Sequence, residues 1–140
     1  MNILFFLTLK SEVAHIYEDD TVRQALDKME GFRYSTIPLL SKDGRYDGTI
    51  TEGDLLWGIR KEYQMDFKEA ENAPVASIAR RADYKPVTAE SRMEDMIDCA
   101  LNQNFVPVVD DRGLFIGIIT RKDIIKFCYE KLKKEHEKGN

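Results

Sequence analysis

The stretch GTITEGDLLWGI, residues 48–59, returns in related form as GIITRKDIIKFC, residues 117–128. Both copies contain the pattern Gly-x-Ile-Thr-x-x-Asp, and two aliphatic residues follow it in each. The two copies are separated by 69 positions. Self-similarity at a fixed period indicates a chain built from repeated structural units.

The repetition extends upstream of this motif. Pro38 aligns with Pro107 at the same spacing, whereas Ile16 aligns with Val87 at a spacing of 71. The first copy therefore carries two extra residues near GFRYS, residues 31–35. Each copy spans about fifty residues, which is the size of one supersecondary unit.

Within each copy the residue pattern predicts strand, helix, strand, strand and helix. The first helix of each copy begins near Asp20 or Ser91, which are residue types preferred at helix N-caps. Asp-Gly and Arg-Gly turns then separate two strand-like runs, which indicates a hairpin. The predicted elements are strands at 13–17 and 84–88, helices at 19–29 and 90–101, strands at 35–40 and 104–109, returning strands from Gly48 and Gly117, and helices at 52–63 and 121–136.

The composition argues against several classes of protein. A net charge of −4 over 140 residues opposes a broad basic surface for nucleic acid. Two cysteines and two histidines form no metal-ligand pattern, and we interpret the cysteines as reduced core residues. The apolar run ILFFLTL, residues 3–9, is too short for a membrane span and lacks a cleavage pattern. We expect a cytoplasmic chain whose first strand joins the core.

The Thr-x-x-Asp pattern has a structural interpretation and a functional one. Threonine at a helix start with an acidic residue three positions later forms a capping box, which satisfies orphan amides. Capping alone does not require a glycine at a fixed distance or a proline and a turn upstream. Because both copies keep that whole arrangement in one register, the pattern favours a binding role in addition to capping.

This doubled pattern resembles a tandem pair of CBS domains, the cystathionine β-synthase-type regulatory unit known as a Bateman module. The resemblance covers nearly the whole chain and leaves no catalytic domain, so we do not expect an enzyme. It implies an α/β fold of two pseudo-twofold-related β-α-β-β-α repeats with packed sheets. The expected boundaries are 1–63, a linker at 64–75, and 76–140. The matching stretches are 16–26 with 36–56, and 87–97 with 105–125.

By this resemblance the chain binds an adenosine-containing ligand such as AMP, ADP, ATP, S-adenosylmethionine or a cyclic dinucleotide. The ligand would lie in clefts between the repeats, and neither a metal nor an obligatory cofactor is implied. A carboxylate can accept hydrogen bonds from both ribose hydroxyls, and a helix N-terminus favours phosphate. The family also implies a flat homodimer that signals to a downstream protein. From the net charge and the short apolar run described above, we expect no nucleic-acid or membrane partner.

The resemblance implies that each cleft takes its aspartate from one repeat and its base pocket from the other. Anionic phosphate should prefer the first cleft, because Arg121 and Lys122 flank its motif while Glu52 flanks the other. Bulky Met96 should also narrow the second cleft, where the first has Ala25. The first cleft would use Asp20, Ala25, Tyr34, Ser35, Asn104, Thr120, Arg121, Lys122 and Asp123. The second would use Thr51, Asp54, Ser91, Met96, Gln103 and Asn104, with Ser35 facing them.

A second interpretation belongs to another class of protein. The chain would then be a ligand-free dimerisation or scaffolding module that keeps the fold and its capping boxes. The presence of both threonines and both aspartates favours the ligand-binding interpretation, because packing requires no ribose contact. A thermal-shift measurement with AMP, ATP and S-adenosylmethionine separates the two, since a ligand that binds the native state raises Tm.

Overall fold

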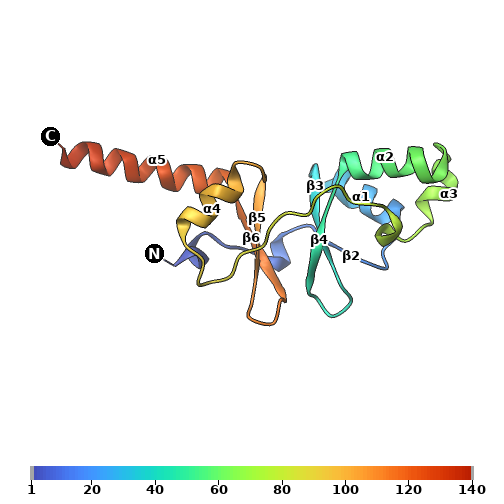
Figure 1. Ribbon diagram of the computed structural model, residues 1–140, viewed down its shortest axis with the longest axis horizontal. Coiled ribbons are helices and arrows are strands. Elements are labelled where there is room, and N and C mark those ends of the chain that lie inside the picture. The colour runs from blue at the N-terminus through green and yellow to red at the C-terminus, as the bar shows by residue number, and fades with distance from the viewer. Residues whose placement is uncertain (1, 140) are drawn as a thin grey trace.

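The two halves of the chain lie side by side, with their sheets facing each other and their helices outside (Figure 1). The computed structural model describes residues 2–139. The first half contains β2 (Ile16–Tyr17), α1 (Val22–Phe32), β3 (Thr36–Leu40), β4 (Tyr46–Thr51) and α2 (Glu52–Tyr63). The second contains α4 (Met93–Ala100), β5 (Phe105–Val109), β6 (Phe115–Thr120) and α5 (Arg121–Lys138). Before and between them lie β1 (Thr8–Leu9), α3 (Phe67–Glu71) and the 3-10 turns Ile3–Phe6, Lys10–Glu12 and Val75–Ser77.

Equivalent hairpins form the centre of each half. In β3–β4 Thr36 pairs with Thr51, and in β5–β6 Phe105 pairs with Thr120, so both antiparallel pairs have the same register. The strand orders are β2-β3-β4 and β1-β6-β5. The predicted fold of two related α/β repeats is therefore confirmed.

The sheets are completed by a crossed connection. Strand β1 precedes the first repeat but pairs antiparallel with β6 of the second, with Thr8 opposite Ile118. Its close approach requires a glycine at position 117, because a Cβ there would overlap the Thr8 carbonyl oxygen. Gly117 also has a φ of +158°, which side-chain-bearing residues rarely adopt. The N-terminal segment thus fastens the two repeats together.

The segment between the repeats makes the reciprocal crossing. It runs back along β4 of the first repeat, where the Thr49 N–H donates to the Asp83 carboxylate at 3.1 Å. The Tyr84 N–H donates to the Thr49 hydroxyl at 3.0 Å. Gly48 sits opposite this segment, because the Asp83 carboxylate occupies the place that a Cβ would take. Each repeat is therefore bordered by chain that precedes the other repeat.

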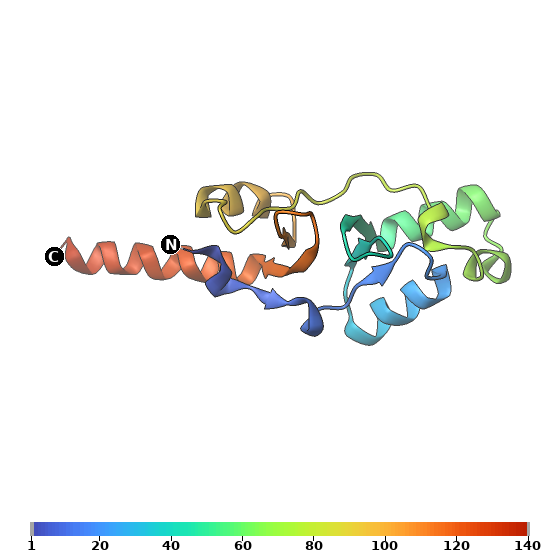
Figure 2. The same ribbon diagram turned by 90° about the horizontal axis from the view of Figure 1, so that it is seen from below.

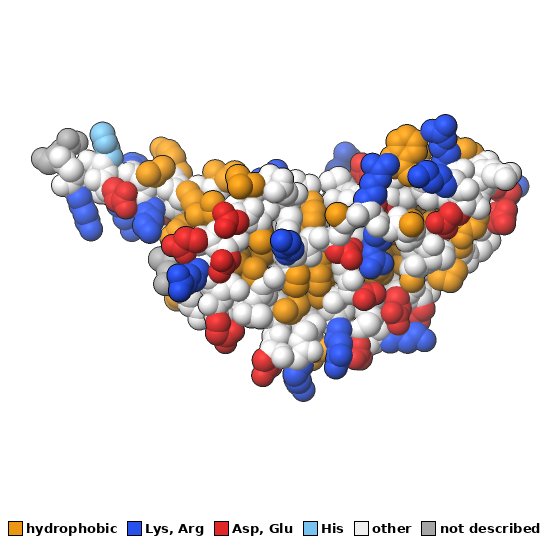
Figure 3. Space-filling model, viewed as in Figure 1, with side chains coloured by type: hydrophobic (Ala, Val, Ile, Leu, Met, Phe, Trp, Pro, Cys, Tyr) orange, Lys and Arg blue, Asp and Glu red, His pale blue; other side chains and the backbone are white. Residues whose placement is uncertain are grey.

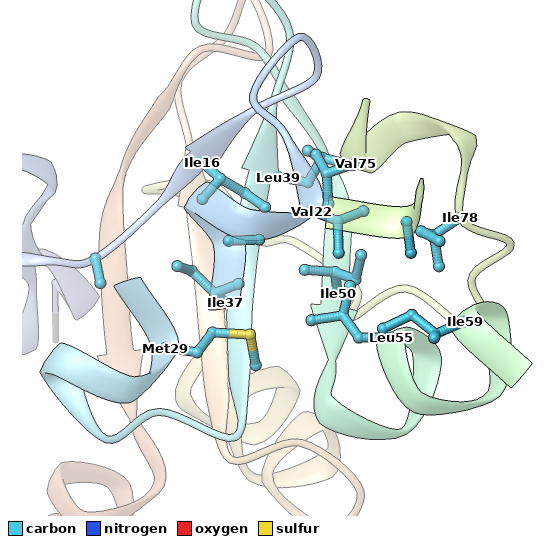
Figure 4. Close-up of a cluster of buried hydrophobic side chains, with 13 residues drawn as sticks. Ile16, Val22, Met29, Ile37, Leu39, Ile50, Leu55, Ile59, Val75 and Ile78 are labelled. Atoms are coloured by element: carbon cyan, nitrogen blue, oxygen red, sulfur yellow. The ribbon is translucent and has the colours of Figure 1, made fainter. Parts of the chain in front are cut away.

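Three hydrophobic clusters hold the chain together. The first fills the first repeat between its sheet and helices, and Figure 4 shows its side chains converging from α1, α2 and the strands. The second fills the equivalent space of the second repeat, and Ile3 of the N-terminal segment is buried in it. The third lies between the two sheets and joins the repeats. Its buried members are Val13, Leu40, Phe105, Phe115 and Ile118.

The turn ends of the hairpins are bonded to each other. The Tyr46 N–H donates to the Gly113 carbonyl at 3.1 Å, and the Phe115 N–H donates to the Gly44 carbonyl at 2.9 Å. Both hairpin turns lie at the bottom of Figure 1, and α5 extends well beyond the body of the molecule in Figures 1 and 2. These bonds fix the sheets at one end, and the space between the sheets at the other end is the cleft described below.

Three predicted strands differ from the observed structure. The strand predicted at 13–17 is present only as β2, Ile16–Tyr17. Residues 3–9 form a 3-10 turn and only a two-residue strand, because the Asn2 side chain accepts from the Leu4 N–H at 2.9 Å and starts the turn. Residues 84–88 form only an isolated bridge, Val87 with Val108. Pro86 has no N–H to contribute to a longer ladder there.

The predicted helix caps also differ. Thr21, not Asp20, is the N-cap of α1, and the Asp20 carboxylate accepts from the Tyr17 N–H at 2.8 Å. Ser91 likewise lies one residue before the N-cap of α4, and its hydroxyl accepts from the Thr88 N–H at 3.1 Å. Both side chains close the turn that leads into the helix instead of capping it. Over residues 2–139 no helix is long and apolar enough to cross a bilayer.

Candidate functional site

A cavity of about 160 Å³ lies between the two repeats. It is an apolar slot with a few polar groups at its edge, which is a common form for a ligand site. Four of the residues that the sequence predicts for the first cleft, Tyr34, Ser35, Asn104 and Thr120, meet here from opposite repeats. The full lining is Val13, Tyr34, Ser35, Thr36, Pro38, Asn104, Phe105, Ile118 and Thr120. We call this cavity the first cleft.

Local backbone geometry places the polar edge of the first cleft. Arg33, the cap residue after α1, adopts the left-handed conformation with φ at +58°, and the Tyr34 N–H then donates to the Met29 carbonyl at 3.0 Å. The next carbonyl, that of Ser35, accepts from the Glu52 N–H at 3.0 Å. In the second repeat the Asn104 carbonyl accepts from the Arg121 N–H at 3.0 Å. The first turns of α2 and α5 are thereby held against the cleft.

The two motif aspartates lie in different surroundings. Asp54 is 3% exposed, and its carboxylate accepts from the Thr51 N–H at 3.0 Å and the Arg81 N–H at 3.1 Å. Asp123 is only partly buried, and its carboxylate accepts no hydrogen bond from residues 2–139. Its own N–H still donates to the Thr120 hydroxyl at 3.2 Å. The capping box is therefore complete at Asp54 and only half formed at Asp123, which leaves the Asp123 carboxylate available.

Asp123 follows the first cleft along the chain but lines a separate groove. Thr120 lines that cleft, while Asp123, one helical turn further, lines a groove of about 390 Å³ with the N-terminal segment and Lys126. Lys122 is exposed beside it. The Arg121 guanidinium is held at the cleft, because its Nε donates to the Gln103 carbonyl at 3.0 Å. Two cations and a free carboxylate thus surround the N-terminus of α5.

Two predicted cleft residues lie elsewhere. Ala25 and Met96 are both fully buried in the cores of their repeats. Their helical positions point at the sheet instead of the inter-repeat space. The expectation that their difference in size makes the clefts unequal is therefore wrong, since neither side chain exposes a surface to a cleft. Asp20 lies at the turn before α1, where its carboxylate holds the Tyr17 amide.

The residues predicted for the second cleft are bonded to the protein itself. The Gln103 side chain is 7% exposed and accepts from the Lys85 N–H at 2.9 Å. Its amide donates to the carbonyls of Lys85 and Phe105. Asp54 and Ser91 hold backbone amides as described above, and the Thr51 hydroxyl accepts from the Asp54 N–H at 2.9 Å. The structure does not gather these side chains around one cavity.

The predicted site residues did not include five that line the first cleft, namely Val13, Thr36, Pro38, Phe105 and Ile118. Val13 lies three residues before the aligned position Ile16, in a stretch that precedes the doubled motif. His15 holds it in place, because the His15 Nδ1 is 2.7 Å from the Val13 carbonyl oxygen. Burial lowers the pKa of His15, and the ring packs edge-on to Tyr17. The apolar residues Val13, Ala14 and Ile16 were the available signal, but they indicated a strand and not a cleft wall.

Comparison with known proteins identifies related chains. The family model described as CBS domain matches residues 8–61 and 75–130. The uncharacterized protein MJ1225 of Methanocaldococcus jannaschii is 25% identical over 133 residues, covering 86% of this chain and 47% of that protein. The chain thus spans about half the length of that relative.

Two solved structures share the fold. The crystal structure of CbpB in complex with c-di-AMP superposes with a TM-score of 0.83 at 20% identity, covering 99% of this chain and 91% of that one. The crystal structure of CBSX2 in complex with AMP has a TM-score of 0.73 at 21% identity, with 92% and 96% covered. At this identity the likeness shows the arrangement of the backbone.

Proposed function

The chain belongs to the CBS domain family, and on that basis we propose that it is a regulatory module that binds an adenosine-containing nucleotide between its two repeats. The observation that carries the proposal is the first cleft, whose walls come from both repeats and include Thr120, three residues before the free Asp123 carboxylate. A ligand there contacts both halves of the chain at once. It can therefore shift their relative arrangement, provided that it binds one arrangement better than the other.

The size of the first cleft bears on how a nucleotide would lie. Its volume of about 160 Å³ is below the roughly 300–1,000 Å³ of typical ligand pockets. We infer that it encloses one ring of the ligand, between Tyr34 and Phe105. The ribose would then extend past Thr120 to the Asp123 carboxylate, which accepts from its hydroxyls. The phosphates would lie at the N-terminus of α5, near Arg121 and Lys122, where the helix dipole favours negative charge.

The neighbouring structures support this class of ligand. One is CbpB in complex with c-di-AMP and the other is CBSX2 in complex with AMP, and both ligands contain adenosine. The shared chemistry is a purine ring, a ribose and a phosphate, which is what the first cleft and the N-terminus of α5 would hold. We therefore propose AMP and c-di-AMP as the first ligands to test, followed by ATP and S-adenosylmethionine.

We also propose that the chain forms a homodimer through its helical faces. Phe32 is 57% exposed, and Leu56 and Phe67 are each 49% exposed. Leu56 and Phe67 line an open apolar hollow of about 1110 Å³ formed by α1, α2 and α3, and Phe32 lies next to two of its lining residues in the chain, Gly31 and Arg33. On α5 the exposed Ile125, Tyr129 and Leu132 continue along one face. Figure 3 shows such hydrophobic patches along the helical rim.

A second copy of the chain is the occupant that we propose for this rim, because both repeats offer equivalent apolar helices. Leu56 and Ile125 are related by the repeat spacing, so a self-complementary contact can use both. Light scattering should show a dimer at micromolar concentration. Leu56→Glu should shift the mass toward the monomer, and Lys61→Glu, which changes an exposed residue of the same helix, serves as the control. A monomeric wild type contradicts the dimer and leaves ligand binding intact.

Isothermal titration tests the proposed binding. The wild type should bind at least one of AMP, c-di-AMP, ATP and S-adenosylmethionine saturably. Asp123→Asn should bind it more weakly, and Asp111→Asn, an exposed carboxylate in the β5–β6 turn, should bind as the wild type does. If none of the four binds, the proposal fails. The chain would then be better described as the ligand-free dimerisation module.

A further inference from the structure

We propose that Tyr84 closes the second cleft from within, so that each chain takes one nucleotide, in the first cleft alone. The inference rests on the proposed function, and it names the residue that makes two related clefts unequal. The alignment of the two repeats gives, for each residue that lines the first cleft, the equivalent residue that should line the second.

The alignment places Tyr84 at the position that Val13 holds in the first cleft. Val13 and Tyr84 stand three residues before the aligned pair Ile16 and Val87. Both belong to the cluster that joins the repeats. Each remaining lining residue has its counterpart 69 positions away in the other repeat, so that Tyr34 corresponds to Gln103 and Ile118 to Thr49. The expected lining of the second cleft is Tyr84, Gln103, Asn104, Phe105, Pro107, Ser35, Thr36, Thr49 and Thr51.

Tyr84 contacts three members of that lining. Its hydroxyl accepts from the Asn104 N–H at 3.3 Å, and its ring lies 5.0 Å from the Phe105 ring in an edge-on arrangement. Its own N–H donates to the Thr49 hydroxyl. Asn104 and Phe105 come from the second repeat and Thr49 from the first. Tyr84 therefore bridges the two walls, its side chain on the second repeat and its backbone N–H on the first, at the position where Val13 leaves a cavity on the other side.

The Tyr84 side chain also occupies the groups of the cleft wall that a ligand would otherwise contact. An aromatic ring packs edge-on to Phe105, and an oxygen atom accepts from the Asn104 N–H. Nearby, the Gln103 amide is bonded to Lys85 and Phe105. Two of the polar groups at the wall of the second cleft are thus already paired with the protein.

The segment that carries Tyr84 is anchored on both sides. The Tyr46 hydroxyl donates to the Tyr84 carbonyl at 2.6 Å. Just before it, Asp83 pairs with Arg80 at 2.8 Å and holds the Thr49 N–H. The Arg81 N–H is bonded to the Asp54 carboxylate. Moving Tyr84 out of the cleft would break these hydrogen bonds. The tyrosine is therefore a fixed part of the wall and not a lid.

The asymmetry extends to the motif aspartates. At the second cleft, the segment that carries Tyr84 also binds the Asp54 carboxylate, because the Arg81 N–H donates to it. On the first side, the corresponding N-terminal segment leaves the Asp123 carboxylate without a hydrogen bond from residues 2–139. In the second cleft, Tyr84 therefore occupies the site for a ligand ring and Arg81 occupies the Asp54 carboxylate. At the first cleft, both the ring site and the Asp123 carboxylate are open. A ligand that needs both finds them together in the first cleft only.

The test is the number of AMP molecules bound per chain, measured by isothermal titration. The wild type should bind one. Tyr84→Val, which copies the first-cleft residue, should bind a second AMP with an affinity at least tenfold weaker than the first, because Asp54 remains engaged. Val13→Tyr, the reciprocal change, should lower affinity in the first cleft by at least tenfold. Tyr84→Phe keeps the ring and should still bind one.

Circular dichroism and gel filtration check that each variant is folded. If Tyr84→Val does not fold, Tyr84→Leu offers a larger apolar replacement, and the wild-type stoichiometry still decides the matter. Two AMP molecules per wild-type chain would overturn the inference and leave the proposed function standing. A folded Tyr84→Val that binds only one AMP would also overturn it. If neither the wild type nor Tyr84→Val binds AMP, both the inference and the AMP-binding form of the proposed function fail.

Discussion

Replacing Asp54 by asparagine should destabilise the chain far more than the same change at Asp123. Asp54 is 3% exposed, and its two carboxylate oxygens accept from the Thr51 and Arg81 amides. An asparagine offers one acceptor oxygen, so one of these amides would face an NH2 group. Leaving a buried donor unsatisfied costs about 1–3 kcal/mol. At Asp123 no protein donor depends on the carboxylate, and a change at such a position usually stays within about 0.5 kcal/mol.

Urea denaturation of the two variants measures this difference. With a slope of about 2 kcal/mol per molar, the midpoint of Asp54→Asn should fall by about 0.5–1.5 M, and that of Asp123→Asn should barely move. Hydrogen exchange should also increase at the Arg81 amide in Asp54→Asn alone. Equal midpoint losses in the two variants would refute the reasoning, because the chemical change is identical and only the hydrogen bonds differ.

Four further outcomes are expected. Asp123→Asn should weaken AMP binding about tenfold or more, because a charge-assisted hydrogen bond contributes about 1.5–3 kcal/mol; unchanged affinity on titration would show that the ribose lies elsewhere. Burial lowers the pKa of His15, so the unfolded state takes up its proton first, and stability should fall as pH drops below about 6.5. Urea midpoints at pH 7 and pH 5 should show less of this loss in His15→Gln than in the wild type. Gly117→Ala should cost at least about 1–3 kcal/mol, since a Cβ would meet the Thr8 carbonyl in a strained conformation, whereas Gly31→Ala, with open space around it, should cost nothing measurable by urea. Saturating nucleotide should change hydrogen exchange at the rim of the first cleft but not at the bonded hairpin turns near Tyr46 and Phe115, and identical exchange patterns would contradict a ligand-induced tilt.

The parts of the fold that repeat could be predicted from the sequence, since they follow local rules. The hairpins, the helices α2 and α5 and the threonine caps depend on residues a few positions apart, so the doubled pattern around Gly48 and Gly117 was enough. The helix caps near Asp20 and Ser91 were misplaced by one residue. An aspartate or serine next to a helix start satisfies a preceding turn equally well, and composition does not separate the two roles.

The differences between the clefts could not be predicted, because they depend on contacts across the whole chain. Nothing near Asp54 in the sequence indicates that the Arg81 amide will reach its carboxylate. The size contrast between Ala25 and Met96 misled us, since both belong to helix faces that pack on the sheets. The informative contrast was between Val13 and Tyr84. The repeat spacing aligns them, but only the folded chain shows that this position lies in a cleft wall.

The crossed pairing of β1 with β6 also sets an order of events during synthesis. Thr8 pairs with Ile118, so its partner is made about 110 residues later. At roughly 5–20 residues per second, the ribosome needs about 5–20 s to supply that partner. During this interval the N-terminal segment, with Phe5 and Phe6, has no sheet to join, while the first repeat can already close its own core. A nascent chain halted before β6 should therefore expose this apolar segment to chaperones and proteases. The segment should become protected from both once the second hairpin has emerged.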